Sequence, residues 1–256
     1  MSVLKVTDSV ECYRQAALSA HVRMLAGRGG DDVSTEFANA RILEALEPTQ
    51  SDVLLDIGCG DGCLLRMAEG RVGRSVGVVP TVEEKSKLLA SYPSLTVLVG
   101  LAQKLPVDSD SASLIVCNSV LLLLKSEENV LAALSEIVRV ARPGAKIWLG
   151  EIPSVDEYPY FKNYRGTSVM GLLWHQLTNR GFYTFLSTGK QVCRSLLGKE
   201  TLVLSAGEIY YETPEKFMGL AQKCGMQPKA HFKYVRKDRR GNLIESPFRH
   251  NYVFTR

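Results

Sequence analysis

The chain has 256 residues, of which 45% are hydrophobic and 23% charged, a composition typical of a soluble globular protein. Its net charge of +4 is mild and does not by itself indicate nucleic-acid binding. The sequence shows no basic stretch leading into an apolar one at its start and no run of about 18 apolar residues, so it predicts neither a signal peptide nor a membrane span.

The cysteines indicate a reducing environment. They are scattered along the chain and form no C-x-x-C pair. We interpret them as reduced thiols that fill the core of a cytoplasmic protein. The six are Cys12, Cys59, Cys63, Cys117, Cys193 and Cys224.

The first 48 residues predict a helical cap. Asp8 and Glu11 form a D-x-x-E capping pattern in front of a helix that is expected to end near Gly27. A second helix is expected over residues 34–48, where Pro48 stops it.

Residues 50–152 alternate between strand and helix patterns. Alternation of this kind predicts a parallel sheet with helices on both faces. The strands are expected over residues 52–58, 75–79, 95–100, 111–120 and 145–152, and the helices over 62–70, 81–93 and 126–144. Pro143 and Gly144 are expected to end the last of these helices.

Residues 153–205 interrupt the alternation and predict a helical insertion that forms a lid. The stretch from Tyr158 to Phe185 is rich in aromatic residues that could line an acceptor pocket or form the core of the inserted helices. Residues 206–256 predict a helix capped by Thr213 and then two strands. We therefore expect a single domain over residues 1–256.

A glycine-rich loop follows the first strand of the alternating region. "LLDIGCGDGCLL" places Gly58, Gly60 and Gly62 between a strand and a helix, where a ligand can approach the main chain. A dinucleotide fingerprint requires G-x-G-x-x-G, but Cys63 occupies the last glycine position. The loop therefore argues against a nicotinamide or flavin dinucleotide.

Four segments together resemble a known family. "VLLDIGCGDG", "VGVVPTVEEKSKLLA", "LAQKLPVDSDSASLIVCNSVLLLL" and "ALSEIVRVARPGAKIWLGEIP" are similar, in order, to the motifs of class I S-adenosylmethionine (SAM)-dependent methyltransferases. The resemblance covers residues 50–152. It implies an α/β, Rossmann-like sheet of seven strands, mostly parallel with an antiparallel last strand, and SAM as cofactor.

The resemblance also implies positions for the cofactor. Asp56 would orient its amino group, the loop would pass beneath its methionine part, and Asn118 would lie near the sulfonium. The expected cofactor-binding residues are Asp56, Gly58, Cys59, Gly60, Val79, Pro80, Ala102, Gln103 and Asn118. Of these, Ala102 and Gln103 would contact the adenine.

The sequence departs from the family at the ribose position, where an acid is usual and Val79 stands, followed by Pro80. Leu101 and Ala112 also replace common aspartates. A lost charged hydrogen bond of about 1.5–3 kcal/mol would weaken cofactor binding roughly ten- to a hundredfold without abolishing it. Thr81 or Glu83 is expected to supply a substitute polar group if the loop turns back.

Methyl transfer to an alcohol requires a base with a pKa near 7, which favours histidine. His175 lies in the aromatic insertion and is the candidate base; His21, on the cap, is a weaker one. Glu151 lies at the end of the fifth strand, at the carboxyl edge of the sheet where α/β proteins bind ligands, and is a candidate base or substrate anchor. No spacing of His, Asp and Glu suggests a metal.

The expected function is O-methylation of a small molecule, such as a sugar, a glycan precursor or another hydroxylated metabolite. A non-catalytic binding or scaffold protein on the same fold is the alternative. A nucleic-acid methyltransferase using the basic residues 229–240 is a third, but "CNSVLLLL" lacks the proline-rich signature of base amino-group methylation. The sequence leaves the oligomeric state open.

Overall fold

The computed structural model describes residues 3–6, 8–19, 21–22, 25, 32–156, 169–175, 177, 182–197, 202–205, 210–238 and 240–256. Its helices are α1 (Ser9–Ser19), α2 (Asp32–Leu46), α3 (Cys63–Ala68), α4 (Val82–Ser91), the 3-10 helix η2 (Leu121–Leu124), α5 (Glu127–Val140), α6 (Val169–His175), α7 (Phe182–Leu196) and α8 (Pro214–Lys223). Its strands are β1 (Val3–Val6), β2 (Val53–Ile57), β3 (Arg74–Val79), β4 (Val97–Val99), β5 (Ala112–Asn118), β6 (Ala141–Pro153), β7 (Leu202–Ser205), β8 (Gln227–Lys237) and β9 (Leu243–Thr255).

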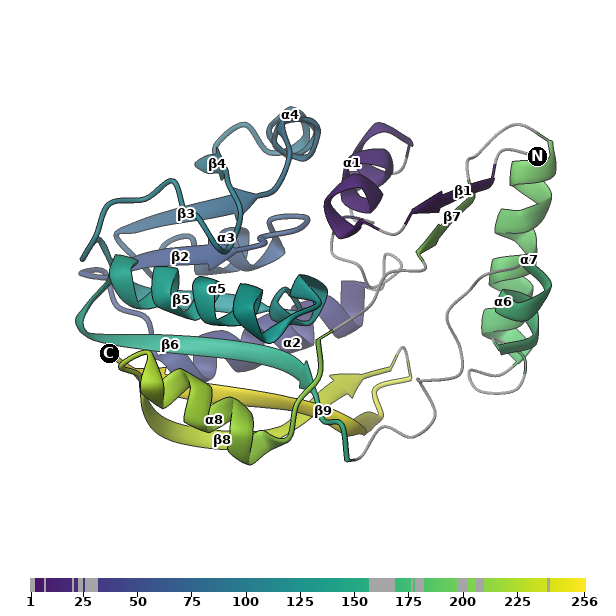
Figure 1. The fold of residues 1–256 in the computed structure, drawn as a ribbon. Coiled ribbons are helices and arrows are strands. Elements are labelled where there is room, and N and C mark those ends of the chain that lie inside the picture. Colours follow the sequence, from purple (N-terminus) through teal and green to yellow (C-terminus); the bar gives the residue numbers. More distant parts are fainter. Residues whose placement is uncertain are drawn as a thin grey trace.

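The main sheet has seven strands in the order β4-β3-β2-β5-β6-β9-β8 (Figure 1). Strands β2 to β6 pair in parallel, whereas β9 is antiparallel to both β6 and β8. The predicted sheet, with its antiparallel last strand, is confirmed. Its order reverses between β2 and β5, which places the carboxyl ends of both strands at a crevice suited to a ligand.

Both faces of the sheet are covered by helices (Figure 1). Leu55 and Ile57 of β2 join the core beneath α5 and α8, whereas Leu54 joins a second core with α2 and α3. This alternation follows from the two-residue period of a strand. Because both faces are buried, the strand is a mostly apolar run, interrupted only by Asp56, and was predicted from that pattern.

Two helices end earlier than their predicted ranges. Helix α1 ends at Ser19 and not near Gly27, because Ala17 and Val22 are both buried in one core cluster yet would lie about 140° apart on a continuous helix. Helix α5 ends at Val140, before Pro143, because a residue preceding proline is disfavoured in helical conformation and the chain is already extended.

A second, two-stranded sheet was not predicted. β1 pairs in parallel with β7, joining the start of the chain to the end of the insertion. Helices α6 and α7 pack against each other within the predicted insertion. No helix in the described part of the chain is long and apolar enough to cross a membrane.

Candidate functional site

A cavity of about 380 Å³ opens at the carboxyl ends of β2, β3 and β5. That volume is in the range of small-molecule sites. Residues following each of these strands line it, and α1 forms one wall through Asp8, Ser9, Val10 and Tyr13. All the expected cofactor-binding residues line this cavity: Asp56, Gly58, Cys59, Gly60, Val79, Pro80, Ala102, Gln103 and Asn118.

The glycine loop forms the floor of the cavity with its main chain. Gly58, Gly60 and Gly62 have φ angles of 76°, 54° and 70°, a left-handed conformation that favours glycine. The amides of Gly58 and Cys59 donate to the Val78 carbonyl at 2.8 and 3.2 Å, which ties the loop to β3. The loop is therefore held in a fixed shape by its backbone.

Cys59 contributes main chain and not a reactive thiol. Its residue surface is 6% exposed, and a Cβ added to Gly77 would lie 2.6 Å from its sulfur. Burial raises the pKa of the Cys59 thiol well above its ordinary value. The side chain is a neutral packing group between the loop and β3.

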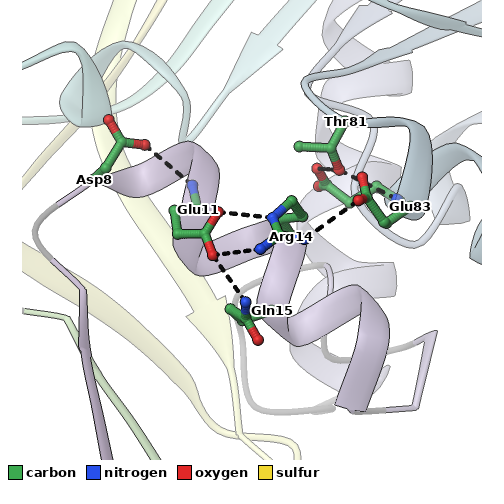
Figure 2. Close-up of polar contacts among 7 residues, drawn as sticks. Asp8, Glu11, Arg14, Gln15, Thr81 and Glu83 are labelled. Atoms are coloured by element: carbon green, nitrogen blue, oxygen red, sulfur yellow. Dashed lines mark hydrogen bonds and ion pairs between the residues drawn. The ribbon is translucent and has the colours of Figure 1, made fainter.

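The ribose position carries no polar side chain on the strand itself. Val79 ends β3 and is 1% exposed, and Pro80 follows it. Glu83, one of the two expected substitutes, does not line the cavity; its carboxylate lies 3.4 Å from Nη1 of Arg14 on α1 (Figure 2). That expectation is wrong for Glu83 because the first turn of α4 directs it toward α1.

Glu84, the next residue, lines the cavity instead and is 3% exposed. Its Oε2 accepts from the Thr81 hydroxyl at 2.8 Å, and its amide donates to the same hydroxyl at 3.2 Å. This is a capping box at the start of α4. Burial raises the pKa of Glu84 to about 7, against the opposing effect of the hydrogen bonds from Thr81.

Two further walls of the cavity carry polar groups. Asp56, near the end of β2, is 5% exposed. On another wall, the turn in which the Lys104 amide donates to the Leu101 carbonyl at 2.9 Å presents Ala102 and Gln103. A carboxylate on one side and a carboxamide on the other suit a ligand with a cationic end and a heteroaromatic end.

Asn118, at the end of β5, is held by its neighbours. Its Oδ1 accepts from Trp148 Nε1 at 3.2 Å, and its Nδ2 donates to Glu151 Oε1 at 3.1 Å. The Glu151 carboxylate also pairs with Arg249 and is 2% exposed. Glu151 is not among the described residues that line the cavity, so it lies behind Asn118.

The sequence interpretation missed Arg249 and Asn251. Asn251 Oδ1 accepts from the Glu151 amide at 2.9 Å, where Glu151 has a φ of 61° in an irregular part of β6. Both residues lie in the segment "RHNYVFT". The first residues of an antiparallel last strand lie beside the carboxyl end of β6. The predicted antiparallel last strand could therefore have indicated that Arg249 and Asn251 lie near Glu151.

Neither candidate histidine is placed at this cluster by the part of the chain that the structure describes. His21 is exposed and is not among the described residues that line the cavity. His175 ends α6, and its side chain lies outside the described residues, as do Tyr158, Tyr160, Phe161 and Tyr164. Among the residues that are described, no cluster of His, Cys, Asp and Glu could hold a metal.

Comparison with known families agrees with this geometry. Residues 55–149, which include the glycine loop, Asp56 and Asn118, match the model of the methyltransferase domain family. No curated protein matches the sequence significantly.

Solved structures share the fold over most of the chain. A SAM-dependent methyltransferase from Methanosarcina mazei is 17% identical with a TM-score of 0.55, covering 84% of this chain and 96% of that one. A methyltransferase from Haloferax volcanii, in complex with the Trm112 activator, is 14% identical with a TM-score of 0.62, covering 98% of each chain. Geranyl diphosphate C-methyltransferase from Streptomyces coelicolor, with S-adenosylhomocysteine, is 12% identical with a TM-score of 0.54, covering 87% and 79%. At these identities the likeness establishes the fold and does not identify the methyl acceptor.

Proposed function

We propose that the chain is a class I SAM-dependent methyltransferase, since residues 55–149 match the methyltransferase domain family, and that it transfers the methyl group of SAM to a hydroxyl group of a small molecule, such as a sugar or a glycan precursor. The observation that carries the proposal is the cavity of about 380 Å³ whose floor is the main chain of the glycine loop. Helix α1 forms one wall of this cavity, which favours a small acceptor over a bulky one.

The residues present fit SAM at both of its ends. We assign Asp56 to the cofactor's amino group, since a buried carboxylate is stabilised by a cationic partner. The loop from Gly58 to Gly60 lies under the methionine part, and Gln103 offers both a donor and an acceptor to adenine. The strand end at Val79 offers nothing to the ribose hydroxyls.

When bound, SAM supplies a methyl group on a good leaving group. The chain then has two tasks, to align the acceptor with the methyl group and to remove the proton of the acceptor hydroxyl. We assign the first task to Asn118, whose amide orientation is fixed on one side by Trp148 and on the other by Glu151.

We assign Glu151 a positioning role in place of the expected role as base. Asn118 and Arg249 each engage one of its carboxylate oxygens. These contacts hold the carboxylate behind Asn118, and Glu151 is not among the described residues that line the cavity, so it is poorly placed to accept a proton from substrate. His175, in the insertion, remains the proposed base.

Calorimetry with SAM and S-adenosylhomocysteine (SAH) tests cofactor binding. We expect a dissociation constant in the micromolar range or somewhat weaker. Absence of heat at millimolar ligand would contradict the proposal. Turnover is then followed as SAH release with matched acceptors carrying a hydroxyl, an amine or neither, and mass spectrometry of the hydroxyl acceptor should show one added methyl group.

The alternative of a non-catalytic binding protein rests on one observation, the apolar Val79 at the ribose position. It predicts an occluded pocket beside Gly58 to Gly62, weak or absent binding of SAH, and no methylated product with any acceptor class. Turnover by the wild type distinguishes the two. Replacing His175 with alanine then tests the proposed base, because the substitution should reduce turnover at least tenfold and leave SAH affinity unchanged.

A further inference from the structure

The strand that leads into the ribose position ends in apolar residues, although a ribose presents two hydroxyls that need partners. Val79 is 1% exposed and Pro80 has no amide hydrogen to donate. A cofactor whose hydroxyls met only these residues would lose hydrogen bonds to water without replacing them. Another part of the wall must therefore serve the ribose if the proposed function holds.

Glu84 is the acidic side chain nearest in sequence that lines the same cavity as Val79 and Pro80. It lies five residues beyond Val79, in the first turn of α4, and is 3% exposed. Its neighbour Glu83 has a side chain that is 33% exposed and is turned to Arg14. The helix thus directs one of two adjacent carboxylates into the cavity wall and the other away from it.

Capping alone does not require this burial. A capping box works equally well at the protein surface, where its carboxylate keeps its hydration. Here both Thr81 and Glu84 are buried, and burial opposes ionisation of the carboxylate, as its raised pKa shows. Buried carboxylates with such shifts in a cavity are typical of functional sites.

The Glu84 carboxylate has room for further hydrogen bonds. An ionised carboxyl group has about four acceptor sites. The Thr81 hydroxyl donates to Oε2 at 2.8 Å and fixes the orientation of the group. Sites beyond those used by Thr81 remain for donors in the cavity, and hydroxyl groups are donors of the required kind.

We propose that Glu84, oriented by Thr81, accepts hydrogen bonds from the ribose hydroxyls of SAM. It takes the place of the acidic residue that is usual at the position of Val79. This inference rests on the proposed function and assigns one part of its site. The ribose-binding carboxylate has moved from the end of β3 to the first turn of α4. The chain thereby binds the cofactor's sugar with a helix residue, and Val79 is free to pack in the core.

The test compares ligands with and without the hydroxyls. Calorimetry measures SAH and its 2′-deoxyadenosyl and 3′-deoxyadenosyl analogues on the wild-type protein and on Glu84→Gln. Glutamine also forms capping boxes, so the helix start is retained. We expect the wild type to prefer SAH over at least one analogue by about tenfold or more, and Glu84→Gln to reduce that preference to about threefold or less.

Glu83→Gln is the matched control, because it makes the same chemical change one residue away and outside the cavity wall. It should keep the wild-type preference. Asp8→Asn probes the other described acid that lines the cavity near α1. Loss of the preference in Asp8→Asn and not in Glu84→Gln would overturn the assignment.

Equal weakening of SAH and both analogues by Glu84→Gln would indicate a structural role and would also overturn it. If Glu84→Gln does not fold, Glu84→Asp, which keeps the charge but shortens the reach, replaces it and should reduce the preference in the same direction. A wild-type protein that binds no SAH contradicts the proposed function itself. If the wild type binds SAH and Glu84→Gln keeps the wild-type preference for SAH over the deoxyadenosyl analogues, only this inference is contradicted.

Discussion

Two glycines with nearly the same backbone angle have very different surroundings. Gly58 has a φ of 76° and Gly70 a φ of 73°. A Cβ added to Gly58 would lie 2.4 Å from Cγ2 of Val120, whereas one added to Gly70 would meet nothing within 4 Å. The pair therefore separates the cost of left-handed backbone from the cost of a collision.

We expect Gly70→Ala to lower the free energy of unfolding by about 1–2 kcal/mol, the penalty for an L-residue in this conformation. Gly58→Ala should lose a further ~1–3 kcal/mol, because Val120 must shift within a packed site. Urea unfolding of both variants measures the difference. Equal losses would show that Val120 yields freely and that the loop is not tightly packed there.

Asp56 should matter for the cofactor and not only for the fold. Asp56→Asn removes the charge that we assign to the cofactor's amino group, and a charged hydrogen bond contributes about 1.5–3 kcal/mol. SAH affinity measured by calorimetry should fall roughly ten- to a hundredfold. Asp108→Asn makes the same change at an exposed residue away from the cavity and should leave the affinity unchanged.

The positions of Glu83 and Glu84 show where sequence interpretation of the site stops. The motifs located the residues that follow each strand, because strand ends are fixed by the sheet. They did not separate two adjacent glutamates on a helix, since successive helical residues point about 100° apart and the rotation of α4 depends on its packing against β3 and α1. Leu88 of α4 is fully buried in the core cluster that contains Val79, and this packing sets the rotation of α4 about its axis.

At the scale of elements, a partly exposed polar network links α1 to α4 beside their apolar contacts. Arg14 lies 2.7 Å from Glu11 on its own helix and 3.4 Å from Glu83 on α4 (Figure 2). Because α1 supplies one wall of the cavity, its attachment governs access to the ligand. Ion pairs of this kind add little to the apolar packing of α1, whose Ala17 is buried in one cluster with Leu88 of α4.

Arg14→Gln should therefore loosen α1 without unfolding the protein. Amide hydrogen exchange in residues 9–19 is expected to accelerate by up to about fivefold, because the ion pairs are lost and the apolar contacts remain. Exchange in β2 and β5 should not change. Arg41→Gln removes a pair confined to α2 and serves as the control; acceleration of α1 exchange in that variant as well would argue against a specific role for Arg14.

The sequence predicted strands correctly where a local pattern of apolar residues determines the structure. The strands at residues 53–57 and 112–118 are mostly apolar, with apolar residues on both faces, and are followed by glycine or polar residues, so their type and order were evident. The pairing of β1 with β7 was not, because each strand has four residues and nearly 200 residues separate them along the chain. Such a pairing depends on tertiary packing and not on a local pattern.

At the scale of the molecule, the topology joins distant parts of the sequence at one edge of the sheet. The parallel strands bring Asp56 and Asn118 together, and the antiparallel β9 adds Arg249 from near the end of the chain. The glycine loop alone identifies only a ligand site. The combination with Asn118, Trp148 and Glu151 gives that site a fixed polar group beside the cavity.

The buried Glu84 also predicts how the stability of the whole fold depends on pH. Burial raises its pKa from 4.5 to about 7, and the neighbouring charge of Glu83 acts in the same direction, whereas hydrogen bonds from Thr81 act against it. Between these two pKa values the folded state binds a proton that the unfolded state has released. The contribution of Glu84 to stability is thus fully present below pH 4.5 and is lost as the pH rises to 7.

We expect the free energy of unfolding of the wild type, measured relative to that of Glu84→Gln, to fall by up to about 3 kcal/mol between pH 4.5 and pH 7 and to remain constant above pH 7.5. Urea unfolding at intervals of half a pH unit measures this difference. Other titrating groups, including the neighbouring Cys59 thiol, are common to both proteins and cancel to first order. A difference that is independent of pH, or that grows as the pH rises, would mean that the Glu84 carboxylate is solvated and would remove the physical basis for its place in the cavity wall.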